Sequence, residues 1–172
     1  DSFYAATKKS NEIMAYSYSK IYNLKITGLR FFTVYGPYGR PDMALFKFTK
    51  NILENKKINL YNKGNHVRDF TYVDDVVYKI SNLINKPSQN KTPYQIYNIG
   101  NGHPEKLKKF LSIIEKITGI KSKINLVAFQ KGDVHKTHAS NKKIEKLIGF
   151  TKKIKLEKGI KNFIEWYKEF YK

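Results

Sequence analysis

Short runs of β-branched and aromatic residues alternate with helical apolar patterns along the whole sequence, and this alternation limits the possible folds more than any other feature. Apolar residues that recur at helical spacing mark the helices, and compact apolar runs mark the strands. The expected helices are 3–23, 43–54, 73–85, 105–117, 141–148 and 156–171, and the expected strands are 26–34, 58–61, 68–72, 94–99 and 123–128. Alternating strands and helices predict an α/β protein. No repeat and no long linker divides it, so residues 1–172 are expected to form a single domain.

The composition excludes several kinds of site. Cysteine is absent, so disulfides and cysteine–metal sites are ruled out. His135 and His138 lie three apart in a polar loop with no third ligand in view, so no metal is expected. No apolar run approaches the roughly 18 residues that a membrane span requires, and no signal segment is found. We therefore expect no membrane partner and a cytoplasmic location.

The net charge of +19 suggests nucleic-acid binding, but the distribution of the charge argues against it. Of the 33 basic residues, 30 are Lys, and they are spread along the whole chain. Such a pattern is typical of a solvated lysine surface, so no nucleic-acid partner is expected. The three arginines, Arg30, Arg40 and Arg68, all fall among the densest motifs. Only Arg offers a planar fork for carboxylate or phosphate groups.

Tyr4 and Lys8 are four residues apart at the start of the first expected helix, which places them on one helix face. A free tyrosine has a pKa of about 10, and a nearby ammonium group favours the phenolate. The pair could therefore act as a general base and acid on a substrate hydroxyl. Tyrosine and lysine are also common neighbours on ordinary helix surfaces, so the spacing alone does not decide.

The context of this pair is more informative. The segments that follow the helix are Thr27–Pro37, Gly39–Ala44, Arg68–Asp75, Gln130–Val134 and Phe163–Tyr167. Together with Tyr4–Glu12 they resemble the extended short-chain dehydrogenase/reductase enzymes that act on nucleotide sugars, the NAD-dependent epimerase/dehydratase family. The similarity is closest to UDP-glucuronate 4-epimerases, and it runs from Tyr4 to the last helix.

The resemblance implies the carboxy-terminal part of a Rossmann-type doubly wound sheet, joined to the small α/β region that binds nucleotide sugars, roughly residues 36–75 and 101–172. The family's glycine-rich cofactor fingerprint is not found, because Gly100-Asn101-Gly102 is followed by His and Pro. The Ser/Thr partner of the catalytic tyrosine is also missing, since Ser2 lies too close to Tyr4. We therefore expect a partial domain without the NAD-binding half, which neither binds NAD tightly nor turns over alone.

The resemblance also implies roles for the pair at the start. Tyr4 would exchange a proton with the sugar C4 hydroxyl, and Lys8 would hold the nicotinamide ribose and favour the phenolate of Tyr4. NAD would take a hydride from C4 and return it to the opposite face. The expected reaction converts UDP-glucuronate to UDP-galacturonate.

Five further residues match substrate positions of the family. Thr33 is typical of the glucuronate branch, and Arg40 would bind the sugar carboxylate. Arg68 matches the diphosphate-binding arginine, Tyr61 an aromatic residue beside the uracil, and Asp133 the residue that binds the nucleotide ribose.

Each of these roles has a plainer alternative. Arg40 could be a surface arginine in a turn, and Tyr61 a core aromatic. Arg68 could form a salt bridge with Asp69 or Asp74. The apolar pair Leu45 and Phe46 fits uracil contacts and an ordinary helix core equally well. Gln130 replaces a second phosphate-binding arginine of UDP-galactose-type enzymes, so no second clamp is expected. Asp74 and Asp75 begin a helix, where acids are mostly structural.

Other functions remain open at this stage. The chain could belong to another nucleotide-sugar enzyme, such as a UDP-glucose 4-epimerase, a 4,6-dehydratase or a decarboxylase. It could also be a non-catalytic remnant. Because family members often dimerise through the catalytic helix, 3–23 is the expected homodimer surface.

Overall fold

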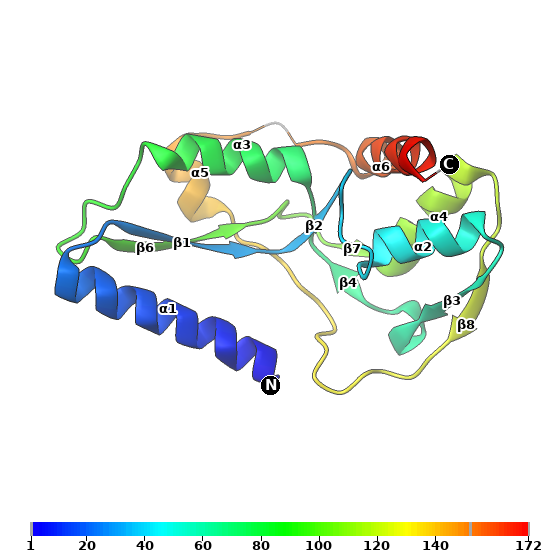
Figure 1. Ribbon diagram of the computed structural model, residues 1–172, viewed down its shortest axis with the longest axis horizontal. Helices are drawn as coiled ribbons and strands as arrows, with labels where there is room; N and C mark the ends of the chain where they lie inside the picture. The colour runs from blue at the N-terminus through cyan, green and yellow to red at the C-terminus, as the bar shows by residue number, and fades with distance from the viewer. Residues whose placement is uncertain (1, 152, 172) are drawn as a thin grey trace.

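The computed structural model describes residues 2–151 and 153–171, and the expected α/β alternation is confirmed (Figure 1). The helices are α1 (Phe3–Tyr22), α2 (Ala44–Leu53), α3 (Val73–Ile84), α4 (Leu107–Thr118), α5 (Lys142–Ile148) and α6 (Leu156–Phe170), with a 3-10 turn η1 (Tyr61–Gly64). The strands are β1 (Ile26–Phe31), β2 (Thr33–Tyr35), β3 (Lys57–Leu60), β4 (Val67–Arg68), β5 (Phe70–Tyr72), β6 (Tyr94–Ile99), β7 (Glu105–Lys106) and β8 (Lys123–Leu126).

The strands pair two by two. β1 with β6, β2 with β5, and β3 with β8 are parallel, whereas β4 and β7 are antiparallel. The expected single strand 26–34 is divided at Phe32: the Phe32 amide donates to the carbonyl of Ile99, and the Thr33 amide donates to the carbonyl of Asp69. The backbone therefore changes its hydrogen-bonding partner from β6 to the strand β5 side of the fold within two residues.

Two hydrophobic clusters hold the elements together. The larger lies among α2, α4, α6 and the central strands, where Phe70 and Phe110 stack with ring centres 4.2 Å apart. The smaller joins α3 and α5 to β6 around Ile99. Burial of each such side chain contributes roughly 1.5–3 kcal/mol. The expected core therefore exists and is centred on the strands.

Two expected helix starts were wrong. Helix α2 begins at Ala44 with Met43 as its cap, because the side chain of Asp42 binds Arg40 instead of the helix amides. Helix α4 begins two residues late, because Glu105 and its neighbour first pair with β4. A local side-chain pair replaced the expected helix cap in the first case, and pairing between two strands delayed the helix in the second.

A buried carboxylate joins three segments at the centre of the fold. Asp69 is fully buried between β4 and β5 and accepts hydrogen bonds from the amides of Asn101 at 2.7 Å, Gly102 at 2.9 Å and Ala139 at 2.8 Å. The buried amine of Lys79 donates to the carbonyl of Gly100 at 2.6 Å from the other side. These bonds attach the turn after β6 and the chain before α5 to the end of β4.

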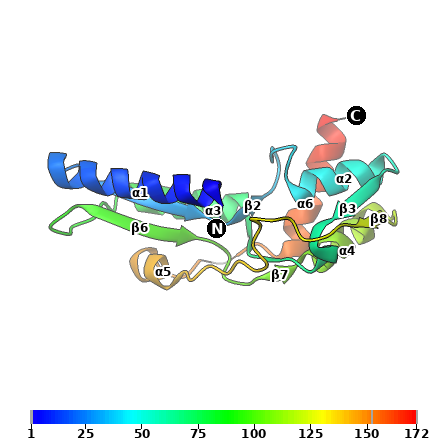
Figure 2. The ribbon, with the colours of Figure 1, turned by 90° about the horizontal axis from the view of Figure 1, so that it is seen from below.

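Helix α1 covers one face of the β1–β6 pair, and α5 lies against the other (Figure 2). Of its 20 residues only Ser19 is buried. The helix is attached by polar contacts: Glu12 forms two bonds with Arg30, at 2.6 and 2.8 Å, and its carbonyl accepts from the hydroxyl of Tyr94 at 3.0 Å. None of the described helices is long and apolar enough to cross a membrane.

Glu12 makes the stability of the fold sensitive to acid. Its hydrogen bond with Arg30, and next that with Lys9, lower its pKa from 4.5 to about 2. The stabilisation is therefore complete above about pH 4.5 and disappears as the pH falls toward 2. Unfolding in urea between pH 2 and 6 should show a flatter pH dependence for Glu12→Gln than for the wild type. The exposed Glu165→Gln should retain the wild-type dependence, and identical curves for all three proteins would contradict the role of Glu12.

Asp69→Asn should destabilise the fold because an amide group cannot accept all three backbone N–H bonds. Breaking such a buried, charge-assisted network costs about 1–3 kcal/mol or more. Urea midpoints would measure the loss. Asp74→Asn, an exposed change in the first turn of α3, should cost less than about 1 kcal/mol. Equal losses for the two variants would show that Asp69 is not a central contact.

Candidate functional site

The start of α1 presents Tyr4 and Lys8 together. The Lys8 ammonium lies 5.3 Å from the centre of the Tyr4 ring, and both side chains are exposed. The N-cap Ser2 accepts a hydrogen bond from the Ala5 amide at 3.2 Å and so defines where the helix begins. The predicted proximity of the pair is therefore present, with the phenol open to solvent.

Thr33 and Arg40 both line one small cavity of ≈ 30 Å³, next to β2, the following loop and α2. Leu45 and Phe46 also line it, but both are buried in the main core. Of the two explanations for this pair, the structure favours the ordinary helix core.

The guanidinium of Arg40 already holds a carboxylate. Its Nε and Nη2 donate to the two carboxylate oxygens of Asp42, although the Arg40 side chain is 76% exposed. The bond raises the pKa of Arg40 and lowers that of Asp42.

Arg68 forms a second arginine–carboxylate pair. Its Nη2 lies 2.8 Å from Oδ1 of Asp133, and its Nη1 donates to the carbonyl of His135 at 3.2 Å. The expected alternatives, a bridge to Asp69 or Asp74, are wrong, because Asp69 points toward backbone amides and Asp133 occupies the fork. Two predicted site residues, 65 positions apart, thus contact each other directly.

The 129–138 segment was expected to be a loop, and it is a loop that docks along β4. Val67 donates to the carbonyl of His135 at 3.0 Å and accepts from the amide of Thr137 at 3.1 Å. The Thr137 hydroxyl accepts from the Asp69 amide at 3.0 Å. This backbone pairing fixes Asp133 beside Arg68.

The sequence analysis did not identify His66, which is buried next to Asp133. Its Nε2 lies 3.1 Å from Oδ2 of Asp133 without the geometry of a hydrogen bond, and its ring packs against Phe129. Burial, followed by the charge of Arg68, lowers the pKa of His66. Alternation along an extended segment puts residues 66 and 68 on the same face, and that signal could have identified it.

Tyr61 opens η1, directly after β3, and is 42% exposed, so it is not a core aromatic. The side-chain nitrogen of the next residue, Asn62, lies 3.2 Å from Nδ1 of His135, so η1 adjoins the 129–138 segment.

The two groups of predicted residues face each other. A Cβ built on Gly132 would lie 3.6 Å from the Cβ of Ser2, so the start of α1 adjoins the 129–138 segment (Figures 1 and 2). Tyr4 and Lys8, at the start of α1, therefore lie on the same side of the molecule as Asp133. No group of three metal-ligating side chains is found among residues 2–151 and 153–171.

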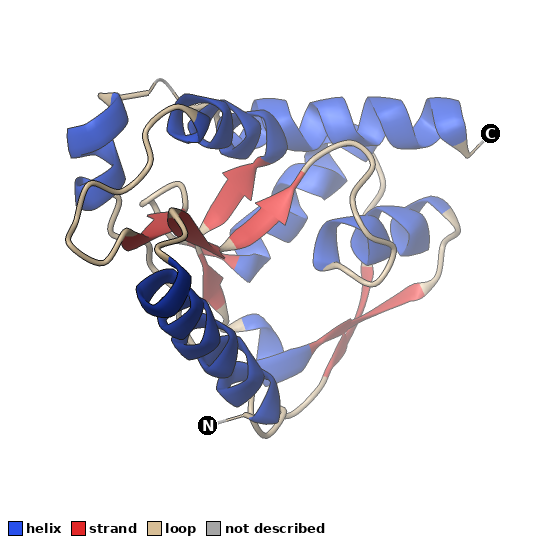
Figure 3. Ribbon diagram, turned by 60° about the vertical axis from the view of Figure 1, so that its left-hand side comes forward, coloured by secondary structure: helices blue, strands red, loops and turns tan. Residues whose placement is uncertain are grey.

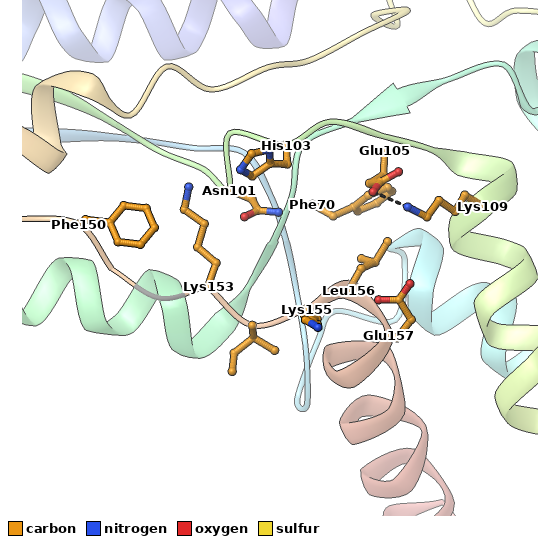
Figure 4. Close-up of a pocket in the computed structure, with 11 residues that line it drawn as sticks. Phe70, Asn101, His103, Glu105, Lys109, Phe150, Lys153, Lys155, Leu156 and Glu157 are labelled. Atoms are coloured by element: carbon orange, nitrogen blue, oxygen red, sulfur yellow. Dashed lines mark hydrogen bonds and ion pairs between the residues drawn. The ribbon is translucent and has the colours of Figure 1, made fainter.

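A second, larger cavity, of ≈ 400 Å³, has none of the predicted site residues in its lining (Figure 4). Phe70, Asn101 and His103 line one side, and residues 153–157 line the other. Its size alone does not make it the site, because the expected acid–base and substrate groups lie elsewhere.

Each of the three arginines pairs with a carboxylate, which gives a direct test of the Arg40 contact. Arg40 and Arg30 both donate through Nε. In arginine-labelled protein, Asp42→Asn should speed the exchange of the Arg40 Nε proton with water and leave that of Arg30 unchanged. NMR with the three arginine Nε signals would measure it. Unchanged exchange at Arg40 would contradict the pairing.

The sequence matches the model of the NAD dependent epimerase/dehydratase family over residues 1–100. The chain is 50% identical over 185 residues to protein CapI of Staphylococcus aureus, which covers 99% of this chain and 55% of CapI. It is 43% identical over 183 residues to UDP-glucuronate 4-epimerase 5 of Arabidopsis thaliana, covering 99% of this chain and 42% of that protein.

A solved structure of the same family resembles the fold of this chain. The UDP-glucuronic acid 4-epimerase from Bacillus cereus, in complex with UDP-glucuronic acid and NAD, superposes with a TM-score of 0.90 at 30% identity. The match covers 98% of this chain and 53% of that one, and corresponds to the carboxy-terminal part of a Rossmann-type structure. The chain thus spans about half the length of the relatives that it matches.

Proposed function

The chain belongs to the NAD dependent epimerase/dehydratase family, and on that premise we propose that it carries the catalytic tyrosine and the nucleotide-sugar side of a UDP-glucuronate 4-epimerase. The observation that supports the proposal is that the start of α1, with Tyr4 and Lys8, adjoins the segment that holds Asp133 against Arg68. The proposed substrate region comprises residues 36–75 and 101–172. The chain alone is proposed to bind the nucleotide sugar without turning it over.

Tyr4 and Lys8 are suited to NAD. Lys8 forms no hydrogen bond or ion pair with any described residue, so its ammonium is free to bind the hydroxyls of the nicotinamide ribose. NAD, when bound, would accept a hydride from the sugar C4 and return it to the opposite face. Tyr4 would remove the proton of the C4 hydroxyl and later give it back. Lys8 would stabilise negative charge on the phenol oxygen.

The nucleotide end of the substrate is assigned to the Arg68–Asp133 pair. Arg68 has a guanidinium fixed by Asp133 and by two backbone carbonyls, and a fixed guanidinium suits a diphosphate. Asp133 is partly exposed, so it can accept hydrogen bonds from the ribose hydroxyls. Tyr61 would stack on the uracil from the end of β3.

The sugar end is assigned to Arg40 and Thr33. The Arg40 fork binds both oxygens of Asp42, which demonstrates in this chain the geometry that a uronate carboxylate requires. The substrate carboxylate would replace Asp42. This observation favours a uronic acid over the uncharged sugar of a UDP-glucose 4-epimerase or a 4,6-dehydratase.

The α1 surface supports the proposed homodimer. The exposed apolar residues of this helix include Phe3, Ile13, Met14, Tyr18, Ile21 and Tyr22. Apolar patches of this kind mark interfaces with other protein surfaces.

We assign the net positive charge to lysines that are spread along the whole chain, and we propose no nucleic-acid partner.

Calorimetric titration tests the proposal. UDP should bind this chain, and Arg68→Ala should weaken UDP about 10- to 100-fold, because hydrogen bonds between charged groups contribute roughly 1.5–3 kcal/mol. Arg30→Ala, which also breaks an arginine–carboxylate pair but at α1, is the matched control and should leave UDP affinity unchanged. NAD alone should show no tight binding.

The sugar assignment uses the same titrations. The wild type should bind UDP-glucuronate more tightly than UDP-glucose, and Arg40→Ala should remove this preference. Equal losses for both sugars would show that Arg40 does not bind the carboxylate. Normal UDP binding by Arg68→Ala would refute the nucleotide site.

A further inference from the structure

The loop of residues 36–42, here the arginine loop, carries Arg40 between β2 and α2 (Figure 3). Its first residue is fixed by packing: a Cβ on Gly36 would meet the Val73 side chain at 2.6 Å, so the backbone lies directly against α3. Its internal bonds are two turn contacts, from the Gly39 amide to the carbonyl of Gly36 at 3.2 Å and from the Met43 amide to the carbonyl of Arg40 at 3.1 Å. Neither contact ties the middle of the loop to the rest of the fold.

Tyr38 lies in the middle of this loop in a backbone conformation that side chains disfavour. Its φ is 60°, in the left-handed region where residues with a Cβ are uncommon. Its side chain is also 79% exposed. An exposed tyrosine in an unfavourable backbone conformation needs a contact that holds it there.

That contact comes from α6. The Tyr38 ring centre lies 5.1 Å from that of Trp166 at an angle of 52°, and 6.4 Å from that of Phe170 at 78°. Trp166 and Phe170 stack on each other at 5.5 Å. These tilted and edge-on arrangements are the favourable ones for aromatic pairs.

The Arg40–Asp42 pair cannot serve this purpose. Asp42 is part of the same loop, so it orients the guanidinium relative to the loop and not relative to the fold. The ring contacts of Tyr38 connect the centre of the loop to α6, next to Gly39, where a Cβ would lie 3.8 Å from the ring of Phe163.

We propose that Tyr38 is a positioning residue: by packing its ring against Trp166 and Phe170 it holds the arginine loop so that Arg40 meets the substrate carboxylate. Helix α6, which contributes none of the residues assigned to the substrate, thereby takes part in sugar selectivity. The inference rests on the proposed function, since it specifies how its carboxylate group is placed.

Titration of this chain with UDP, UDP-glucose and UDP-glucuronate provides the first test. Tyr38→Ala should leave UDP affinity unchanged and reduce the preference for UDP-glucuronate by about tenfold, in line with the loss of two aromatic pairs. Tyr38→Phe retains the ring and should behave as the wild type. The matched control is Tyr78→Ala, an exposed tyrosine on α3, which should also behave as the wild type. Full selectivity in Tyr38→Ala would overturn the proposal.

Tyr38→Gly separates the ring from the backbone. Glycine adopts the left-handed conformation freely, so this variant keeps the turn and loses the ring. If the ring positions Arg40, Tyr38→Gly should lose selectivity as Tyr38→Ala does. Wild-type selectivity in Tyr38→Gly would show that the backbone alone places the loop.

A measurement without ligand distinguishes this inference from the proposed function. Amide hydrogen exchange at Gly39 and Met43 should be about tenfold faster in Tyr38→Ala and unchanged in Tyr38→Phe. Trp166 is the only tryptophan of the chain, so its fluorescence reports whether each variant removed the stack. Unchanged exchange in Tyr38→Ala overturns the positioning role. If the wild type shows no preference for UDP-glucuronate, the sugar assignment fails, and hydrogen exchange still decides whether Tyr38 holds the loop.

Discussion

The buried carboxylate of Asp69 is the contact on which the site depends. It binds amides from the turn after β6 and from the chain before α5. The same two segments also bond to each other, where the Asn141 side chain donates to the carbonyl of Gly100 at 2.9 Å. Arg68, the residue before Asp69, donates a hydrogen bond to Asp133 in the 129–138 segment, which lies along β4. One extended dipeptide therefore joins the interior of the fold to its functional surface, and the site is only as well ordered as the hydrogen bonds of Asp69.

Paired charge is the second organising feature. Glu12, Asp42 and Asp133 each occupy the fork of one arginine, in a chain whose other basic residues are all lysines. The Arg30 pair attaches α1, whereas the pairs of Arg40 and Arg68 border the proposed substrate site. Ion pairs at exposed positions contribute little stability, about 0–1 kcal/mol. Their value at the site is orientation: each guanidinium is already held in the geometry that a carboxylate or a diphosphate would use.

The sequence predicted the α/β alternation and nearly every element, because apolar periodicity depends on local pattern. The division of 26–34 at Phe32 could not be predicted, because the strand changes partners without a break in its apolar run. Strand β7 exists only because Glu105 meets β4. The Tyr4–Lys8 proximity followed from helix geometry, whereas the Arg68–Asp133 contact spans 65 positions and needed the docked segment. His66 was missed because its neighbours Asp133 and Phe129 lie far from it in the sequence.

The most direct test of the central claim is a crystal structure of this chain with UDP-glucuronate. The account predicts the diphosphate at Arg68, the ribose at Asp133, the sugar carboxylate on Arg40 in place of Asp42, and C4 directed toward Tyr4. A nucleotide sugar bound instead in the ≈ 400 Å³ cavity beside His103, or bound at Arg68 with its sugar directed away from Tyr4, would contradict it.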